Sequence, residues 1–509
     1  MKTNIMNTKY IWLLLICLGF VACNDPEDFI DPVEPEVVLP PLTAGSADFS
    51  KFVSVGASFT AGYADGALFN ASQQNSFPNI MAEQFAKAGG GSFTQPMMTG
   101  NFGGLALGGT RIADPRLVFG GAGPVPLESI IGPIIVATDI TNNPTGPFNN
   151  MGVPGAKSFH LLAPGYGNVA GVLSGQANPY YVRMASSPTA TVLGDVIVQA
   201  PTFFSLSEVG GNDVLGYATS GGTGVDQTGN LNPATYGRND ITDPNVFAQA
   251  FNGMVTTLTS GGAKGVVANV PNITDLPHFT TIPYNPVPLD AATAGALNAG
   301  YATYNGGLQQ AFAALTGTGL FTQEELDRRT INFVEGQNAM VVIDEDLTNL
   351  GAINPAFSGI PQYRQATADD LFILSLSSLI PQGYGTQIPL EDKWVLTPEE
   401  QTAIQTATDA YNATISSVAS ANGVALVDLQ TILNQAATTG IPFDDYIVTA
   451  DLVTGGTVSL DGIHLTARGY AFMANKFLEA IDATYGSNFV ASGNVAKAND
   501  YGVMYSPGL

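Results

Sequence analysis

Short, continuous runs of apolar residues recur along the chain, and segments with a helical pattern lie between them. Most of the runs are rich in β-branched residues: Phe52–Val55, Thr202–Leu206, Gly265–Val270, Met340–Ile343 and Val424–Leu429. Such runs are typical of strands that are covered on both faces of a parallel sheet. The alternation of strands with helices therefore predicts an α/β fold, specifically a three-layer α/β/α sandwich with a mainly parallel sheet.

Two helices near the C-terminal end have clear sequence boundaries. The stretch Thr397-Pro398-Glu399-Glu400 is a capping box with proline at the first helical position, and it predicts a helix that runs to about Ala421. Apolar residues between Tyr470 and Ile481 recur on one helical face, and Gly486 is expected to end that helix.

Three stretches interrupt the alternation and are rich in Gly, Pro, Asn and Thr. They cover residues 88–149, 216–245 and 277–390, and we expect long loops or a small cap there. No linker separates a second domain. The sequence therefore predicts one domain over 51–486 and a C-terminal tail over 487–509.

The first residues have the pattern of an export signal. Lys2 and Lys9 accompany the apolar run Ile11–Ala22, which is too short to span a membrane and fits a secretory signal. The run ends in Phe-Val-Ala-Cys, a pattern similar to a bacterial lipobox. We therefore expect a lipoprotein signal peptide over 1–22 and a lipidated Cys23; the alternative is a plain signal peptide followed by an incidental cysteine.

The segment 23–50 is acidic and rich in proline, and it is expected to be an extended tether. Acidic residues directly after the lipidated cysteine resemble the surface-export signal of Bacteroidetes lipoproteins. The expected location is the outer membrane, on the cell surface or facing the periplasm. With no cysteine after Cys23, the exported chain has no disulfide framework.

The charge of the chain excludes nucleic acid as a partner. The 17 basic and 42 acidic residues give a formal net charge of −25, whereas binding of nucleic acid needs a basic surface. Three scattered histidines and the lack of further cysteines argue against a zinc site, and we expect no cofactor. Calcium bound by clustered Asp and Asn side chains, such as those of 239–243, stays open.

Candidate catalytic residues lie at both ends of the predicted domain. Ser58 follows the first predicted strand, in a turn of small residues. Asp461 precedes His464 by three positions, just before the last helix. A turn there can bring the carboxylate to one ring nitrogen and leave the other free, which is the arrangement of an acid and a base in a catalytic triad.

Two further stretches can supply donors for an oxyanion. Gly155 lies in the glycine-rich loop 150–156, and Asn212 follows the strand predicted at 202–206, where ligands bind in open α/β sheets. An asparagine amide and backbone N–H groups are suitable donors. Because the gap between Ser58 and Gly155 is long, Gly104 and Gly109 are alternatives to Gly155.

In this order, the four stretches resemble the four blocks of the SGNH (GDSL-type) hydrolase family. The resemblance extends from about residue 50 to 485, includes an Asn-x-Pro segment at Asn269 and Pro271, and is strongest to the large lipoprotein members from Bacteroidetes. The chain departs from the family at Ala57, where the name-giving motif has aspartate, and at Leu465, where proline often follows the histidine. The resemblance implies a flavodoxin-like sandwich.

The resemblance also implies a serine ester hydrolase, an esterase or a lipase. Ser58 would be the nucleophile, His464 the base and Asp461 the acid that orients it. The N–H groups of Ser58 and Gly155 and the amide of Asn212 would form the oxyanion hole. The substrate would be a small-molecule, glycan or lipid ester, and its acyl and alcohol parts stay open, as does the oligomeric state. The alternative is a non-catalytic surface lipoprotein that binds glycans or lipids on the same fold.

Overall fold

The computed structural model describes residues 38–509, and Leu42–Leu509 form one compact unit. The expected signal peptide 1–22, Cys23 and the tether up to residue 37 lie outside the described residues. The end of the range expected as tether belongs to the compact unit, because Phe49 packs in its core with only 2 % of its surface exposed. The C-terminal tail also reaches the core, through the fully buried Phe489.

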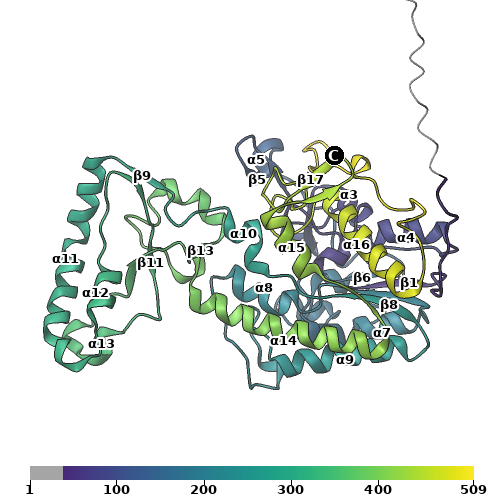
Figure 1. Cartoon of the computed structure of the whole chain (residues 1–509), viewed down its shortest axis with the longest axis horizontal. Coiled ribbons are helices and arrows are strands. Elements are labelled where there is room, and N and C mark those ends of the chain that lie inside the picture. The colour runs from purple at the N-terminus through teal and green to yellow at the C-terminus, as the bar shows by residue number, and fades with distance from the viewer. Residues whose placement is uncertain (1–37) are drawn as a thin grey trace, which may run out of the picture. The chain divides into compact units, whose positions relative to one another are not determined.

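The centre of the unit is a five-stranded sheet in which all neighbouring strands are parallel (Figure 1). In spatial order the strands are β6 (Asn150–Gly152), β1 (Phe52–Gly56), β7 (Phe203–Leu206), β8 (Lys264–Ala268) and β15 (Ala425–Val427). Numbered along the chain, this order is 2-1-3-4-5, so the direction of winding reverses at β1. Ligands of open α/β sheets bind beyond the carboxyl ends of the strands at such a switch point.

Alternate residues of the strands enter two separate hydrophobic clusters, because successive side chains of a strand point to opposite faces. Val53 and Val55 pack in the first cluster with residues of α7 (Val192–Ile197), α9 (Pro244–Thr259) and α14 (Pro398–Asn422). Phe52 and Phe203 pack in the second cluster. That cluster also holds residues of α4 (Phe77–Lys87), α15 (Leu429–Thr438) and α16 (Ala467–Tyr485). Helices therefore bury the side chains of both faces of the sheet.

Four of the five predicted strands lie in this sheet. The fifth is a strand but does not belong to the sheet. The run at 340–343 contains β11 (Val341–Ile343), which pairs antiparallel with β12 (Tyr363–Gln365) outside the sheet. The strand of this sheet that was not predicted is β6, at one edge, in a stretch that we expected to be only a loop. Its three residues, Asn-Met-Gly, carry no β-branched side chain, and pairing with β1 alone makes them a strand.

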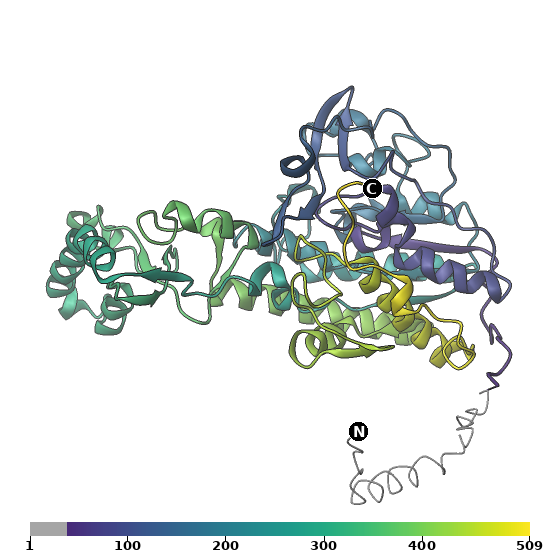
Figure 2. The ribbon, with the colours of Figure 1, turned by 90° about the horizontal axis from the view of Figure 1, so that it is seen from above.

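The segment that follows α10 (Pro277–Thr280) was expected to be long loops or a small cap, and no helix was predicted in it. It contains α11 (Ala291–Leu315), whose residues Leu297, Tyr301 and Leu308 are buried. The segment has hydrophobic clusters of its own and projects away from the sheet in both views (Figures 1 and 2). The helix is rich in Ala, Gly, Thr and Asn, so only these widely spaced large residues mark its buried face.

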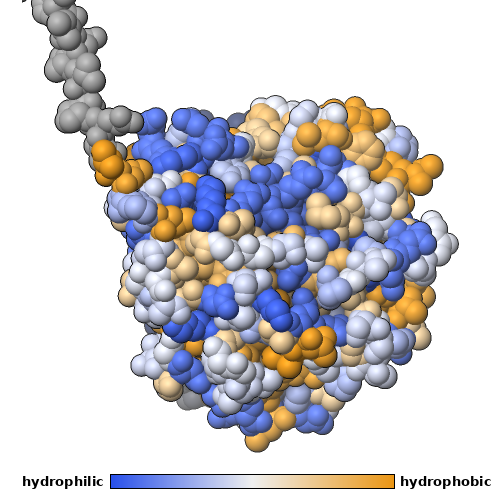
Figure 3. All heavy atoms as spheres, turned by 90° about the vertical axis from the view of Figure 1, so that its right-hand side faces the viewer, coloured by the Kyte–Doolittle hydropathy of each residue, from blue (hydrophilic) through white to orange (hydrophobic). Residues whose placement is uncertain are grey.

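The predicted helices at 397–421 and 470–486 are confirmed as α14 and α16, and Gly423 and Gly486 end them in the left-handed conformation. Among residues 38–509, no helix has the length and hydropathy needed to cross a membrane. On the face shown in Figure 3, hydrophobic residues form small groups separated by hydrophilic ones.

The remaining elements are short. The helices are α2 (Ser58–Ala61), α3 (Asn70–Gln74), α5 (Glu128–Ile131), α6 (Pro179–Val182), α8 (Gly211–Thr219), α12 (Gln323–Arg329) and α13 (Leu350–Ile353). The two-stranded antiparallel sheets pair β2 (Gly103–Leu107) with β3 (Thr110–Pro115), β4 (Leu117–Phe119) with β5 (Pro124–Pro126), β9 (Val287–Leu289) with β10 (Gly336–Asn338), β13 (Leu371–Phe372) with β14 (Val395–Leu396), and β16 (Ile441–Phe443) with β17 (Tyr446–Val448).

A substitution of Gly152, at the end of β6, tests how closely the sheet packs against α2. A Cβ atom at this position would lie 2.3 Å from the backbone nitrogen of Ala61, so the backbone of β6 or α2 would have to move. We expect Gly152→Ala to lower the urea midpoint of unfolding. Gly253→Ala, in α9 where a Cβ meets no atom within 4 Å, should raise the free energy of unfolding by about 0.5–1 kcal/mol. Equal midpoints for the two variants would contradict this packing.

Candidate active site

Ser58 is the first residue of α2, two positions beyond the end of β1. Its surface is 8 % exposed, and its backbone carbonyl accepts the N–H of Tyr63. Within residues 38–509, the backbone N–H of Ser58 has no hydrogen-bond partner. The serine hydroxyl and a free N–H donor therefore lie together at the carboxyl end of the central strand β1.

Glu208 accepts hydrogen bonds from the turn that carries Ser58. The sequence predicted no role for this residue. Its Oε1 atom accepts the N–H of Thr60 at 3.0 Å and also the N–H of Ala57. Its backbone has φ of +47°, a strained conformation for a non-glycine residue, and Oε2 is buried without a partner. Burial raises the pKa of Glu208 to about 7, although the two N–H donors favour the charged form.

Asp461 and His464 form a close acid–base pair in the loop before α16. The distance between Oδ2 of Asp461 and Nδ1 of His464 is 2.7 Å. The same carboxylate accepts the backbone N–H groups of Ile463, His464 and Gly66 at 2.8–2.9 Å. Burial opposes the charge on Asp461, but His464 and these donors outweigh it and hold the pKa of Asp461 well below its usual range.

The imidazole of His464 lies beside two aromatic rings of the segment that begins with Ser58. Its ring centroid is 5.6 Å from that of Phe59 and 4.6 Å from that of Tyr63. The structure therefore brings His464 next to α2. In the described part of the chain, however, no hydrogen bond joins the hydroxyl of Ser58 to the imidazole. Such bonds are often long before substrate binds.

Asn212 lies in the first turn of α8, directly after the strand β7. Its Nδ2 atom donates to the carbonyl of Ala156 at 3.0 Å, so it contacts the loop that contains Gly155. Gly155 is exposed and has φ of +79°. The buried carboxylate of Asp213 accepts both the N–H and the hydroxyl of Ser158 at 2.8–2.9 Å, and this pair fixes the same loop against α8.

The two alternative glycines lie in the β2–β3 hairpin, outside the central sheet. The N–H of Gly109 donates to the carboxylate of Asp139 at 2.7 Å. A Cβ atom at Gly104 would meet the backbone oxygen of Ala113 at 2.9 Å. Both glycines therefore have roles within or next to the hairpin.

The other two histidines are structural. His160 stacks on Tyr166, its Nδ1 accepts the N–H of Lys157, and burial lowers its pKa to about 4. His278 packs against the acid–base loop: its N–H donates to the carbonyl of Gly462, and its Nδ1 lies 3.0 Å from the carbonyl of Asp461. Nothing in the local sequence indicates that His278 contacts Asp461.

An apolar cavity of about 120 Å³ is lined in part by Ser58. Ser58, Glu208 and Asn212 contribute polar groups to its lining. Most of the remaining lining is apolar, from α15, α16 and the loops beside them, and includes Ile273, Leu276, Leu429, Ile432, Leu433, Ala436, Val458, Ile463, Leu465, Phe472 and Met473. A concave apolar site with a few convergent polar groups is typical of a ligand-binding site.

Comparison with known proteins found no match: no family model, no curated protein and no solved structure is similar to this chain.

The raised pKa of Glu208 predicts how stability depends on pH. A carboxyl whose pKa rises from 4.5 to about 7 on folding binds its proton more tightly in the folded state, so stability falls as the pH rises between these values. Glu208→Gln removes this group. The free energy of unfolding of the wild type, relative to Glu208→Gln, should fall by up to about 3 kcal/mol between pH 4.5 and pH 8. Urea unfolding across this range measures the difference, and parallel pH profiles would contradict it.

Proposed function

We propose that this protein is a serine ester hydrolase of the SGNH type. The observation that carries the proposal is the pairing of Asp461 with His464 beside α2, whose first residue, Ser58, lines an apolar cavity. A carboxylate that holds one nitrogen of an imidazole next to a serine is the arrangement that activates a hydroxyl nucleophile.

The proposed reaction is acyl transfer through Ser58. His464 takes the hydroxyl proton through Nε2 while Oγ attacks the ester carbonyl, and Asp461 stabilises the imidazolium that results. The protonated His464 then gives the proton to the leaving alcohol. Water, deprotonated by the same imidazole, releases the acyl group and restores the serine.

The proposed oxyanion donors are the N–H of Ser58, the N–H of Gly155 and the side-chain amide of Asn212. The free N–H of Ser58 and the contact of Asn212 with the loop of Gly155 support this set. The bond from Gly109 to Asp139 favours Gly155 over that hairpin glycine. Loss of one such donor costs about 10²–10³ in rate.

The finer fold assignment is part of the proposal. The strand order 2-1-3-4-5 and the two clusters, one per face of the sheet, support a flavodoxin-like, three-layer α/β/α sandwich. A lipid anchor at Cys23 and an outer-membrane location stay predictions from the sequence.

The cavity favours a substrate with an apolar acyl chain over an acetyl ester. Its lining residues beyond Ser58 are mostly apolar and come from α15, α16 and several loops, and burial of each methylene there contributes about 0.8 kcal/mol. The sequence left the acyl part open, so this preference rests on the structure of the cavity.

A binding protein for a lipid or for the acyl part of a glycolipid is the second candidate. The lack of a hydrogen bond between Ser58 and His464 favours it. Such a protein would use the same cavity without turnover, so catalysis separates the two candidates.

Hydrolysis of p-nitrophenyl acetate and p-nitrophenyl octanoate by the purified protein tests the proposal. We expect turnover of both esters and a loss of roughly 10⁴-fold or more in Ser58→Ala. Ser50→Ala, which removes an exposed serine before β1, should keep full activity. Turnover that survives in Ser58→Ala would contradict the proposal, and a folded wild type without turnover would favour the binding protein.

A substitution of Ala436 tests whether the cavity holds the acyl chain of the substrate. It lines the cavity on α15, and a tryptophan there would fill space near Leu433. We expect Ala436→Trp to lower kcat/KM for the octanoate by roughly tenfold or more and to leave the acetate nearly unchanged. Ala437→Trp, at the next, exposed position of the same helix, is the matched control. Equal losses for both esters would contradict this assignment.

A further inference from the structure

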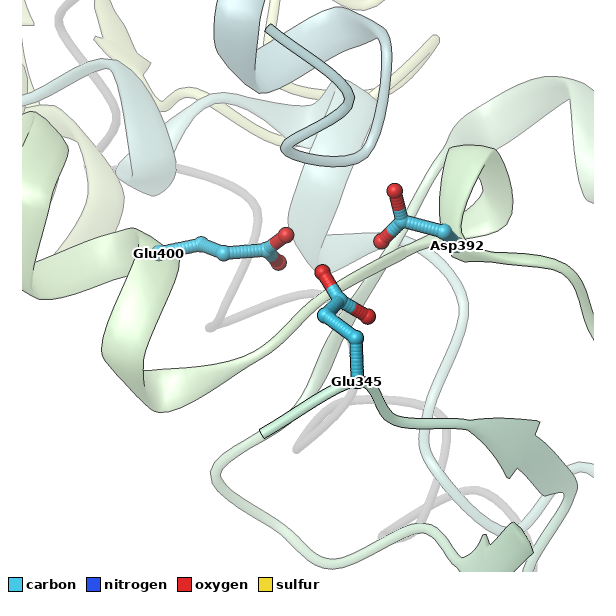
Figure 4. Close-up of side chains that lie close together, drawn as sticks. All are labelled: Glu345, Asp392 and Glu400. Carbon is cyan, nitrogen blue, oxygen red and sulfur yellow. The ribbon is translucent and has the colours of Figure 1, made fainter. Parts of the chain in front are cut away.

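Three carboxylates from three different elements of the chain meet outside the candidate active site. Glu345 follows β11 in the projecting segment, Asp392 begins the short helix η9 (Asp392–Trp394), and Glu400 lies in the first turn of α14. One oxygen of each lies within 4.8 Å of one oxygen of each of the others, and the three side chains point toward one another (Figure 4).

Burial of unpaired oxygens separates this cluster from an ordinary acidic surface. Glu400 is only 5 % exposed, and its Oε1 atom has no hydrogen-bond partner. The Oδ1 atom of Asp392 is likewise buried and unpartnered. Among the described residues, no ion pair involves any of the three side chains. Buried carboxylates without a compensating cation are unfavourable.

We propose that Glu345, Asp392 and Glu400 bind one divalent cation, and that this cation is Ca²⁺. Calcium takes carboxylate oxygens at about 2.3–2.6 Å, so two oxygens on opposite sides of one ion are about 4.6–5.2 Å apart. Oxygens that all lie within 4.8 Å of one another are close enough to bind one such ion together. The three ligands come from a turn and from the starts of two helices, which suits the flexible coordination of Ca²⁺ better than the strict octahedron of Mg²⁺.

Two members of the cluster have raised pKa values. Burial, together with the neighbouring carboxylates, raises the pKa of Asp392 to about 7 and that of Glu400 to about 8.

The proposed ion would join the projecting segment to the sheet. Glu345 belongs to that segment, whereas Glu400 is on α14, which packs in the cluster of the sheet. The loop after α8 also reaches the site, since a Cβ atom at Gly222 would lie 1.6 Å from Oε1 of Glu400. This inference does not rest on the proposed esterase activity.

Calorimetric titration of the chelator-treated protein with CaCl₂, and separately with MgCl₂, tests the proposal. We expect one Ca²⁺ per chain and weaker binding of Mg²⁺. Glu345→Gln, which changes an exposed ligand, should weaken Ca²⁺ binding at least tenfold, whereas Glu399→Gln, an exposed neighbour outside the cluster, should bind within twofold of the wild type. No heat of binding, equal effects of the two variants, or Mg²⁺ bound as tightly as Ca²⁺ would overturn the proposal.

A luminescence titration with Tb³⁺, which substitutes for Ca²⁺, gives a second readout. Trp394 is two residues from Asp392, so excitation of tryptophan should sensitise bound Tb³⁺. The luminescence should fall on addition of Ca²⁺. The affinity for Tb³⁺ should be at least tenfold lower in Glu345→Gln than in the wild type. Luminescence that Ca²⁺ does not displace would contradict a calcium site.

Discussion

Parallel pairing of β1 with both β6 and β7 is the constraint on which the rest of the candidate site depends. Because parallel strands end at the same edge, Ser58, Gly155 and Asn212 follow three adjacent strand ends although they are far apart in sequence. Asp461 comes from the other end of the chain. The N–H of Gly66, in the turn after α2, donates to the carboxylate of Asp461. This bond connects Asp461 to the segment that carries Ser58.

The fold was predictable where local signals and tertiary environment agree. The β-branched runs correctly predicted four strands of the central sheet. The capping box at Thr397 and the glycine after α16 correctly predicted two long helices. The prediction failed at β6, where three residues without strand preference pair only because β1 lies beside them. It failed at α11 because small residues cover most of that helix, and only a few large side chains mark its buried face.

The same contrast holds for the candidate site. Asp461 and His464 are three residues apart, so the sequence could place them together, and the structure shows their bond at 2.7 Å. Glu208 and Ala57 are 151 positions apart, and nothing local indicates that this carboxylate accepts the N–H groups of the serine turn. The acidic cluster likewise exists only after three separate segments have packed. Interactions of this kind depend on tertiary structure and have no local sequence signal.

Covalent labelling with a fluorophosphonate tests the central claim most directly, because the probe reacts only with an activated serine. The account predicts that intact-mass analysis of the purified protein finds one label, that peptide mapping places it on Ser58, and that Asp461→Asn slows the labelling strongly by removing the charge that orients His464. A folded wild type that takes no label, or a label that remains in Ser58→Ala, would contradict the assignment of Ser58 as an activated nucleophile.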